Sequence, residues 1–176
     1  MSRDNLLSSE QDVVVDANVF FAIGHPSNPK YARFRSAVRN AGVVCKLPQR
    51  VIGELGGPKT DRVQAALDEG WAEIIDASSP TDGDAVAASD IATRTIANET
   101  GKPEHEVEKT DAILAGLAIQ YVRDHSTTGV VVLTDDKPAR KGIENAVTAQ
   151  GYTNVISVYG LADIIGDDSS DSMRLI

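Results

Sequence analysis

The chain has 176 residues, 41% of them hydrophobic, and a formal net charge of −9. That length suits one domain with a sizeable core. No apolar run approaches the roughly 18 residues needed to span a bilayer, and the polar N-terminus lacks the apolar stretch of a signal peptide. We therefore expect no membrane segment and a cytoplasmic location. The single cysteine, Cys45, excludes an internal disulfide, and no Cys/His spacing resembles a zinc site.

The acidic charge bears on both the environment and the substrate. Aspartate is abundant, lysines are few and alanine is frequent, a composition typical of halophilic proteins from a salt-rich cytoplasm. An ordinary acidic protein is the other interpretation. An acidic surface repels nucleic acid over long range, but at molar salt the screening length falls to roughly 3 Å. The charge therefore counts only mildly against an RNA substrate.

Short apolar runs typical of buried strands alternate with helical stretches along the chain. In chain order we predict a strand at 13–15, a loop at 18–29, a helix at 30–40, a strand at 43–47, a short helix from Pro48, a helix at 60–69, a strand at 71–77, helices at 83–99 and 104–124, a strand at 129–136, a helix from Lys137 to about Gln150 and a strand at 153–158. Continuous apolar strands that alternate with helices imply a mainly parallel, doubly wound sheet. The expected fold is an α/β domain, a three-layer α/β/α sandwich over 12–165, between a polar segment at 1–11 and an acidic tail at 166–176.

Two of the predicted strands end in acidic residues. Asp16 follows the first strand, and Asp135 and Asp136 follow Thr134 at the end of the fourth. Ligands of doubly wound sheets bind beyond the carboxyl ends of the strands, so these acids lie where a site is expected. Capping of a following helix is the alternative, and Asp136 would suit the helix that begins near Pro138.

Two further carboxylates lie in predicted helices. Asp111 falls on the apolar stripe of the helix at 104–124, between Val107 and Leu114. A carboxylate on a core-facing line is costly unless it is paired or binds a metal, although a buried salt bridge or a helix-end position also explains it. Glu54 lies in an otherwise uncharged stretch of the short helix, where a partly exposed glutamate is the alternative.

Carboxylates from four separate segments would raise one another's pKa values on converging, unless a cation neutralised them. Oxygen ligands without imidazole or thiolate favour Mg²⁺ or Mn²⁺. An ion held in this way is suited to phosphodiester hydrolysis, since it activates water and stabilises charge on the phosphate.

These motifs resemble those of the PIN domains. The family pattern is Asp-x-Asn after the first strand, a glutamate in a short helix after the second, an aspartate near the start of a helix with small residues, and Thr-x-Asp after a later strand. The corresponding segments here are Asp16-Ala17-Asn18, residues 48–55, residues 110–115 and residues 133–136. They occur in the same order across about residues 12–158.

The resemblance implies a PIN-like fold and a Mg²⁺- or Mn²⁺-dependent endoribonuclease, either a VapC-type toxin or an RNA-processing enzyme. It implies catalytic metal ligands at Asp16, Glu54, Asp111 and Asp136, an added or substitute ligand at Asp135, and supporting roles for Asn18 and Thr134. RNA would be the substrate, a toxin would pair with a small antitoxin protein, and a homodimer is usual in the family. The alternative is a non-catalytic PIN-fold module in an RNA-processing assembly, although a scaffold has no need of four acids.

Basic residues near the predicted site are candidates for contacting RNA phosphates. Lys30 and Arg33 lie in the densest basic stretch of the chain, directly after the loop at 18–29, and Lys137 follows the two aspartates of the fourth strand. Such contacts supply affinity without sequence information. A solvated or salt-bridged helix face is the alternative for each.

Overall fold

The computed structural model describes residues 6–76, 80–125 and 129–166. Residues 1–5 of the predicted N-terminal segment and 167–176 of the predicted tail lie outside the described residues. The elements in chain order are β1 (Asp12–Val15), α1 (Ala17–Ile23), α2 (Pro29–Ala41), β2 (Cys45–Pro48), α3 (Gln49–Glu54), α4 (Asp61–Asp68), β3 (Ala72–Ile75), α5 (Gly83–Thr100), the 3-10 helix η1 (Glu104–Glu106), α6 (Lys109–His125), β4 (Val130–Leu133), α7 (Lys137–Gln150), β5 (Ile156–Tyr159) and α8 (Leu161–Ile165). None of these helices is long and apolar enough to cross a membrane.

The five strands form one parallel sheet in the order β3-β2-β1-β4-β5. The chain first builds outward from β1 through β2 to β3, and then returns to the other side of β1 for β4 and β5. The strand order therefore reverses between β1 and β4, which are paired from Asp12↔Val130 to Val15↔Leu133. Such a reversal opens a crevice at the carboxyl ends of the strands, where doubly wound sheets bind ligands.

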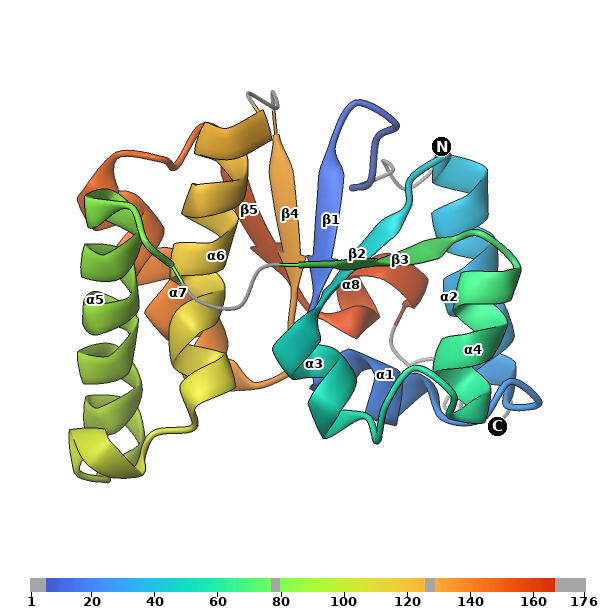
Figure 1. Ribbon diagram of the computed structural model, residues 1–176, viewed down its shortest axis with the longest axis horizontal. Helices are drawn as coiled ribbons and strands as arrows, with labels where there is room; N and C mark the ends of the chain where they lie inside the picture. Colours follow the sequence, from blue (N-terminus) through green and yellow to red (C-terminus); the bar gives the residue numbers. More distant parts are fainter. Residues whose placement is uncertain (1–5, 77–79, 126–128, 167–176) are drawn as a thin grey trace, which may run out of the picture.

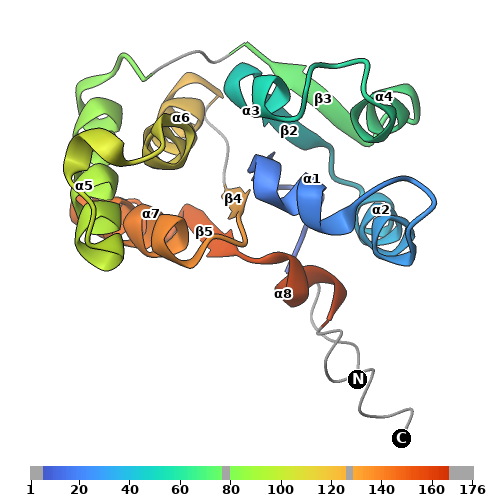
Figure 2. The same cartoon turned by 90° about the horizontal axis from the view of Figure 1, so that it is seen from below.

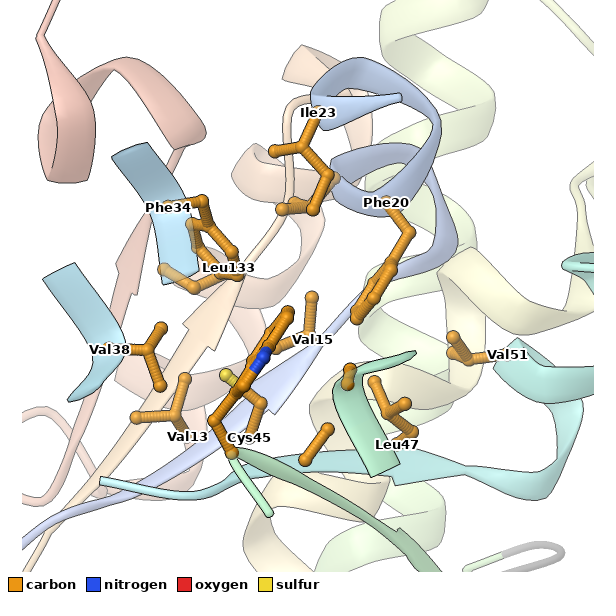
Figure 3. Close-up of a cluster of buried hydrophobic side chains, with 14 of the residues drawn as sticks. Val13, Val15, Phe20, Ile23, Phe34, Val38, Cys45, Leu47, Val51 and Leu133 are labelled. Carbon is orange, nitrogen blue, oxygen red and sulfur yellow. The ribbon is translucent and has the colours of Figure 1, made fainter. Parts of the chain in front are cut away.

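Helices cover both faces of the sheet, as Figures 1 and 2 show, which confirms the predicted α/β/α sandwich. Alternation along β1 divides the core in two: Val13 and Val15 pack among α1, α2, α3, α4 and α8, whereas Val14 packs among α5, α6 and α7. Trp71 is fully buried in the first cluster, stacked on Phe20 with a centroid distance of 6.0 Å. Figure 3 shows the strand side chains of this cluster facing Phe20 and Phe34.

Two predicted elements near the site are corrected by the structure. Residues 18–23, expected to be loop, belong to α1, because Asp16 caps the first turn and Val19, Phe20 and Ile23 bury one side of it. The helix predicted at 104–124 begins only at Lys109. Before it, a 3-10 turn follows Pro103, and Val107 is extended, with φ −70° and ψ 133°. Val107 therefore lies outside the helical stripe, and Asp111 occupies the first turn of α6 rather than its interior.

Candidate active site

Asp16 forms the buried centre of the site, with a relative exposure of 2%. It ends β1 and caps α1, so that its Oδ1 accepts a hydrogen bond from the backbone N–H of Ala17 at 2.7 Å. Its Oδ2 accepts from Thr134 Oγ1 and from Asn18 Nδ2, both at 2.9 Å. Three donors therefore hold one carboxylate at the reversal point of the sheet.

Asn18 joins the two strand ends. Its Nδ2 also lies 3.1 Å from Thr134 Oγ1, and its Oδ1 accepts from the backbone N–H of Asp135 at 2.8 Å. The start of α1 is thus fixed to the residues that follow β4. Through these contacts Asn18 and Thr134 orient the carboxylate of Asp16.

The two consecutive aspartates after β4 point to different places. Asp135 is exposed, and its Oδ1 accepts from the backbone N–H of Leu161 at 2.7 Å, at the start of α8. Asp136 caps α7 through Ala139 N–H at 2.9 Å, and its charge raises the pKa values of Asp16 and Asp111. The capping alternative is therefore realised for Asp136, and the placement favours Asp136 over Asp135 as the fourth acid of the site.

The charges of Glu54 and Asp136 act on the pKa values of both Asp16 and Asp111, so the four acids lie near one another. Burial raises the pKa of Asp111 most, and the charges of Asp16, Asp136, Glu54 and Glu108 add to the shift, so that the pKa reaches about 7. Burial also raises the pKa of Asp16 to about 6, with added repulsion from Glu54 and Asp136, while the hydrogen bonds from Thr134 and Ala17 oppose the shift. Figure 2 shows α1, α3 and the first turns of α6 around the end of β4.

The hydroxyl of Thr134 offers a direct test of how Asp16 is held. We expect Thr134→Val to lower the free energy of unfolding by about 1–2 kcal/mol, because the variant keeps the shape and leaves a buried carboxylate with one donor fewer. Urea unfolding at fixed salt measures the loss. The matched control is Thr93→Val, since the Thr93 hydroxyl only donates to the Ser89 carbonyl of its own helix at 2.8 Å. Equal losses in the two variants would contradict a special role for Thr134.

The family model of the halobacterial PIN domain matches residues 9–173 of the chain. The chain belongs to the PIN-domain family. No curated protein and no solved structure matches this sequence. PIN domains are generally nucleases that use divalent metals.

The donor chemistry of this PIN domain suits a hard cation. Its four acids offer oxygen ligands alone, and a positive charge would relieve the repulsion that acts on Asp16 and Asp111. Within residues 6–76, 80–125 and 129–166, however, no three Asp, Glu, His or Cys side chains stand close enough to enclose an ion. The acids therefore surround a common region without forming a closed coordination shell.

The predicted phosphate contacts fall in three different places. Arg33 donates to the backbone carbonyl of Ile165 at 2.6 Å, which ties α2 to α8. Lys30 lies in the first turn of α2, and Lys137 is exposed in the first turn of α7, next to Asp136. Of the three, only Lys137 is adjacent in the chain to an acid of the site.

Sequence reasoning did not consider two cations that are near the acids in the chain. Arg50 precedes Glu54 by four residues on α3, so both lie on one face of that helix. Lys109 opens α6 two residues before Asp111. The spacing of Arg50 from Glu54 within the segment at 48–55 was the signal that could have identified the first of them.

Proposed function

We propose that this PIN domain is a metal-dependent endoribonuclease that hydrolyses RNA phosphodiester bonds with Mg²⁺ or Mn²⁺. The observation that carries the proposal is Asp16, a carboxylate buried to 2% exposure whose pKa is raised by burial and by the acids Glu54 and Asp136. Such repulsion destabilises a fold unless a ligand offsets it. Four acids at the reversal point of the sheet are therefore better explained by a bound cation than by a structural role.

In this proposal Asp16, Glu54, Asp111 and Asp136 hold the ion. The ion, when bound, supplies an activated water and charge stabilisation on the scissile phosphate. The protein fixes the positions of the ligands. Thr134 and Asn18 hold the carboxylate of Asp16 in place, and the backbone N–H of Ala139 holds that of Asp136. Asp135 supports the arrangement indirectly, through its contact with the start of α8.

The biological setting of the nuclease is also part of the proposal. A VapC-type toxin with a small antitoxin, an RNA-processing enzyme, and a homodimer of either all agree with the family. The open arrangement of the acids suits one further candidate, a non-catalytic PIN module that binds within an RNA-processing assembly. A cleavage assay separates that module from a nuclease.

The decisive assay is cleavage of a mixed structured RNA by the purified protein in molar KCl with Mg²⁺ or Mn²⁺. We expect Asp16→Asn to reduce cleavage by more than about 100-fold, beyond the 10- to 100-fold usual for residues that only support a metal ligand. The matched control is Asp68→Asn, an exposed aspartate at the end of α4. A chelator should stop cleavage without unfolding the protein. Cleavage that survives the chelator, or that is equal in Asp16→Asn, would overturn the metal mechanism.

The acidic surface leads to a separate prediction, that the protein is halophilic. With a net charge of −9, self-repulsion should destabilise the fold in dilute buffer and be screened in molar KCl. We expect the melting temperature to rise by roughly 5–10 °C between the two, which corresponds to about 2–3 kcal/mol for a chain of this size. Thermal unfolding monitored by circular dichroism measures it. Equal melting temperatures in the two buffers would rule out salt-dependent stability.

A further inference from the structure

An exposed phenylalanine lies on α1, the helix that begins at the acidic site. Phe21 is 51% exposed, and among the residues that the structure describes Val86 on α5 is the only other large hydrophobic side chain that is exposed. The buried side of α1 consists of other residues: Ala17, Val19, Phe20 and Ile23. Figures 1 and 2 show α1 beyond the carboxyl ends of the strands. The ring of Phe21 is therefore not part of the core and is open to a ligand.

Phe21 is one helical turn from Asn18, which contacts Asp16 directly. Residues three apart on a helix are neighbours, with roughly 5–6 Å between their Cβ atoms. Asn18 and Phe21 both lie outside the buried side of α1, and Asn18 Nδ2 donates to Asp16 Oδ2 at 2.9 Å. Because the Cα–Cβ bond of a helical residue tilts toward the helix N-terminus, the side chain of Phe21 leaves α1 toward the turn of Asn18. Phe21 is thus adjacent to the acidic site on the outer surface of α1.

The guanidinium of Arg62, at the start of α4, lies over the ring of Phe21. Its Cζ is 5.0 Å from the ring centroid, a cation–π contact, and its Nη1 donates to the backbone carbonyl of Phe20 at 3.4 Å. The neighbouring carboxylate of Asp61 contacts Nε2 of His25 at 3.2 Å and offsets the charge of Arg62. A planar aromatic ring and a planar guanidinium are therefore held together on a patch with little net charge.

A nucleobase fits this patch better than a protein does. Specific protein interfaces bury roughly 1,200–2,000 Å², with few charged residues at their core, whereas Phe21 is bordered by Arg62, Asp61 and His25. A base needs only one flat face, and bases in single-stranded RNA stack on aromatic rings and on arginine guanidinium planes. Stacking does not depend on attraction of phosphates, so it suits a protein of net charge −9.

We propose that Phe21 and Arg62 form a stacking platform for one base of the RNA substrate, next to the acidic site. The base packs against the ring and the guanidinium, and the adjoining nucleotide lies on the side of Asn18, toward Asp16. Every base has an aromatic face, so the platform positions single-stranded RNA without selecting its sequence. The platform deepens the proposed nuclease function and rests on it for the identity of the ligand as RNA.

NMR of the phenylalanine rings tests the platform without requiring cleavage. The chain has three phenylalanines, and Phe20 and Phe34 are fully buried, so they serve as internal controls. A short single-stranded oligoribonucleotide is titrated into the full chain, isotope-labelled at phenylalanine, to about 10 mM, above the Kd of a weak millimolar ligand. The buffer contains EDTA and the lowest KCl concentration that keeps the protein folded. We expect the ring signals of Phe21 to shift and those of the other two to change far less, and an oligomer of the same length without bases to leave all three in place.

Two variants of Phe21 separate stacking from apolar contact. Phe21→Leu keeps an apolar side chain without an aromatic face, so RNA binding should weaken about 10-fold, whereas Phe21→Tyr should bind as the wild type does. Backbone amide signals at 16–22 report binding in all these proteins. The matched control is Val86→Ala, which truncates the other exposed hydrophobic side chain and should leave binding unchanged.

Four results would each overturn the platform. The first three are no shift of the Phe21 ring at the highest RNA concentration, an equal shift by the oligomer without bases, and equal binding by Phe21→Leu and the wild type. The fourth is a shift of the Phe21 ring with protein concentration in the absence of RNA, which would identify an interface between copies of the chain.

The cleavage assay separates this proposal from the nuclease itself. If the wild type cleaves RNA and Phe21→Leu raises KM more than it lowers kcat, both stand. If the wild type cleaves RNA but the Phe21 ring does not respond to RNA, the platform falls and the nuclease stands. If RNA shifts the Phe21 ring and is not cleaved, the platform belongs to a non-catalytic module that binds RNA.

Discussion

The Asp111→Asn variant is expected to lose RNA cleavage and, without metal, to be more stable than the wild type above pH 7. The pKa of Asp111 is about 7 in the folded protein and near 3.8 in the unfolded chain. Between those values the folded state retains a proton that the unfolded state releases, so stability falls as pH rises through this range. Asparagine resembles the protonated carboxyl and removes that loss.

The stability difference between variant and wild type should be near zero at pH 4 and reach a plateau above pH 7. We expect the plateau at about 1–3 kcal/mol, because Asp111 is partly exposed and solvent screens its charge. Asp16, with a pKa of about 6, acts in the same direction in both proteins. Urea unfolding with EDTA at pH 4, 5, 6, 7 and 8 measures the difference.

The control for Asp111→Asn is Asp124→Asn, an exposed aspartate near the other end of α6. Its stability should run parallel to that of the wild type at every pH. Addition of Mg²⁺ at pH 8 should stabilise the wild type and the control more than Asp111→Asn, since a ligand that binds only the folded state adds stability. If the stabilities of Asp111→Asn and the wild type changed with pH in the same way, Asp111 would not be repelled by Asp16, Asp136 and Glu54.

The sheet and its two acidic strand ends were predictable from the sequence because both depend on local patterns. The valine runs at 13–15 and 130–132 contain no polar residue, as is typical of a buried parallel strand. Asp16 directly follows the first strand, Asp136 comes three residues after the end of the other, and the carboxyl ends of parallel strands lie at the same edge of the sheet. That Asp16 and Asp136 lie near each other therefore followed from the parallel arrangement of the two strands.

The orientation of the site acids depended on contacts that no local pattern encodes. Asp135 and Asp136 are neighbours of one residue type, yet the first binds the start of α8 and the second caps α7. The apolar spacing from Val107 to Leu114 fits a helix, whereas the extended backbone of Val107 delays α6 until Lys109. Because α6 begins only at Lys109, Asp111 lies in its first turn, where the charges of Glu54 and Asp136 raise its pKa.

The Gly116→Ala variant is expected to lose about 2–3 kcal/mol of stability, at the upper end of the range for overpacking. Alanine normally improves a helix by up to about 1 kcal/mol over glycine. Here a Cβ at position 116 would stand 2.5 Å from the backbone carbonyl oxygen of Ala85 and 2.3 Å from Ser89 Oγ. A side chain can turn aside, but the carbonyl belongs to the backbone of α5, so the two helices would have to separate.

The matched control is Gly53→Ala in α3, where nothing lies within 4 Å of the added Cβ. That variant should be more stable than the wild type by up to about 1 kcal/mol, the ordinary helix effect. Urea unfolding of both proteins in molar KCl measures the opposite signs. A stabilised Gly116→Ala would show that α5 and α6 separate easily. Because α6 carries Asp111, this close contact between α5 and α6 also holds one acid of the site in place.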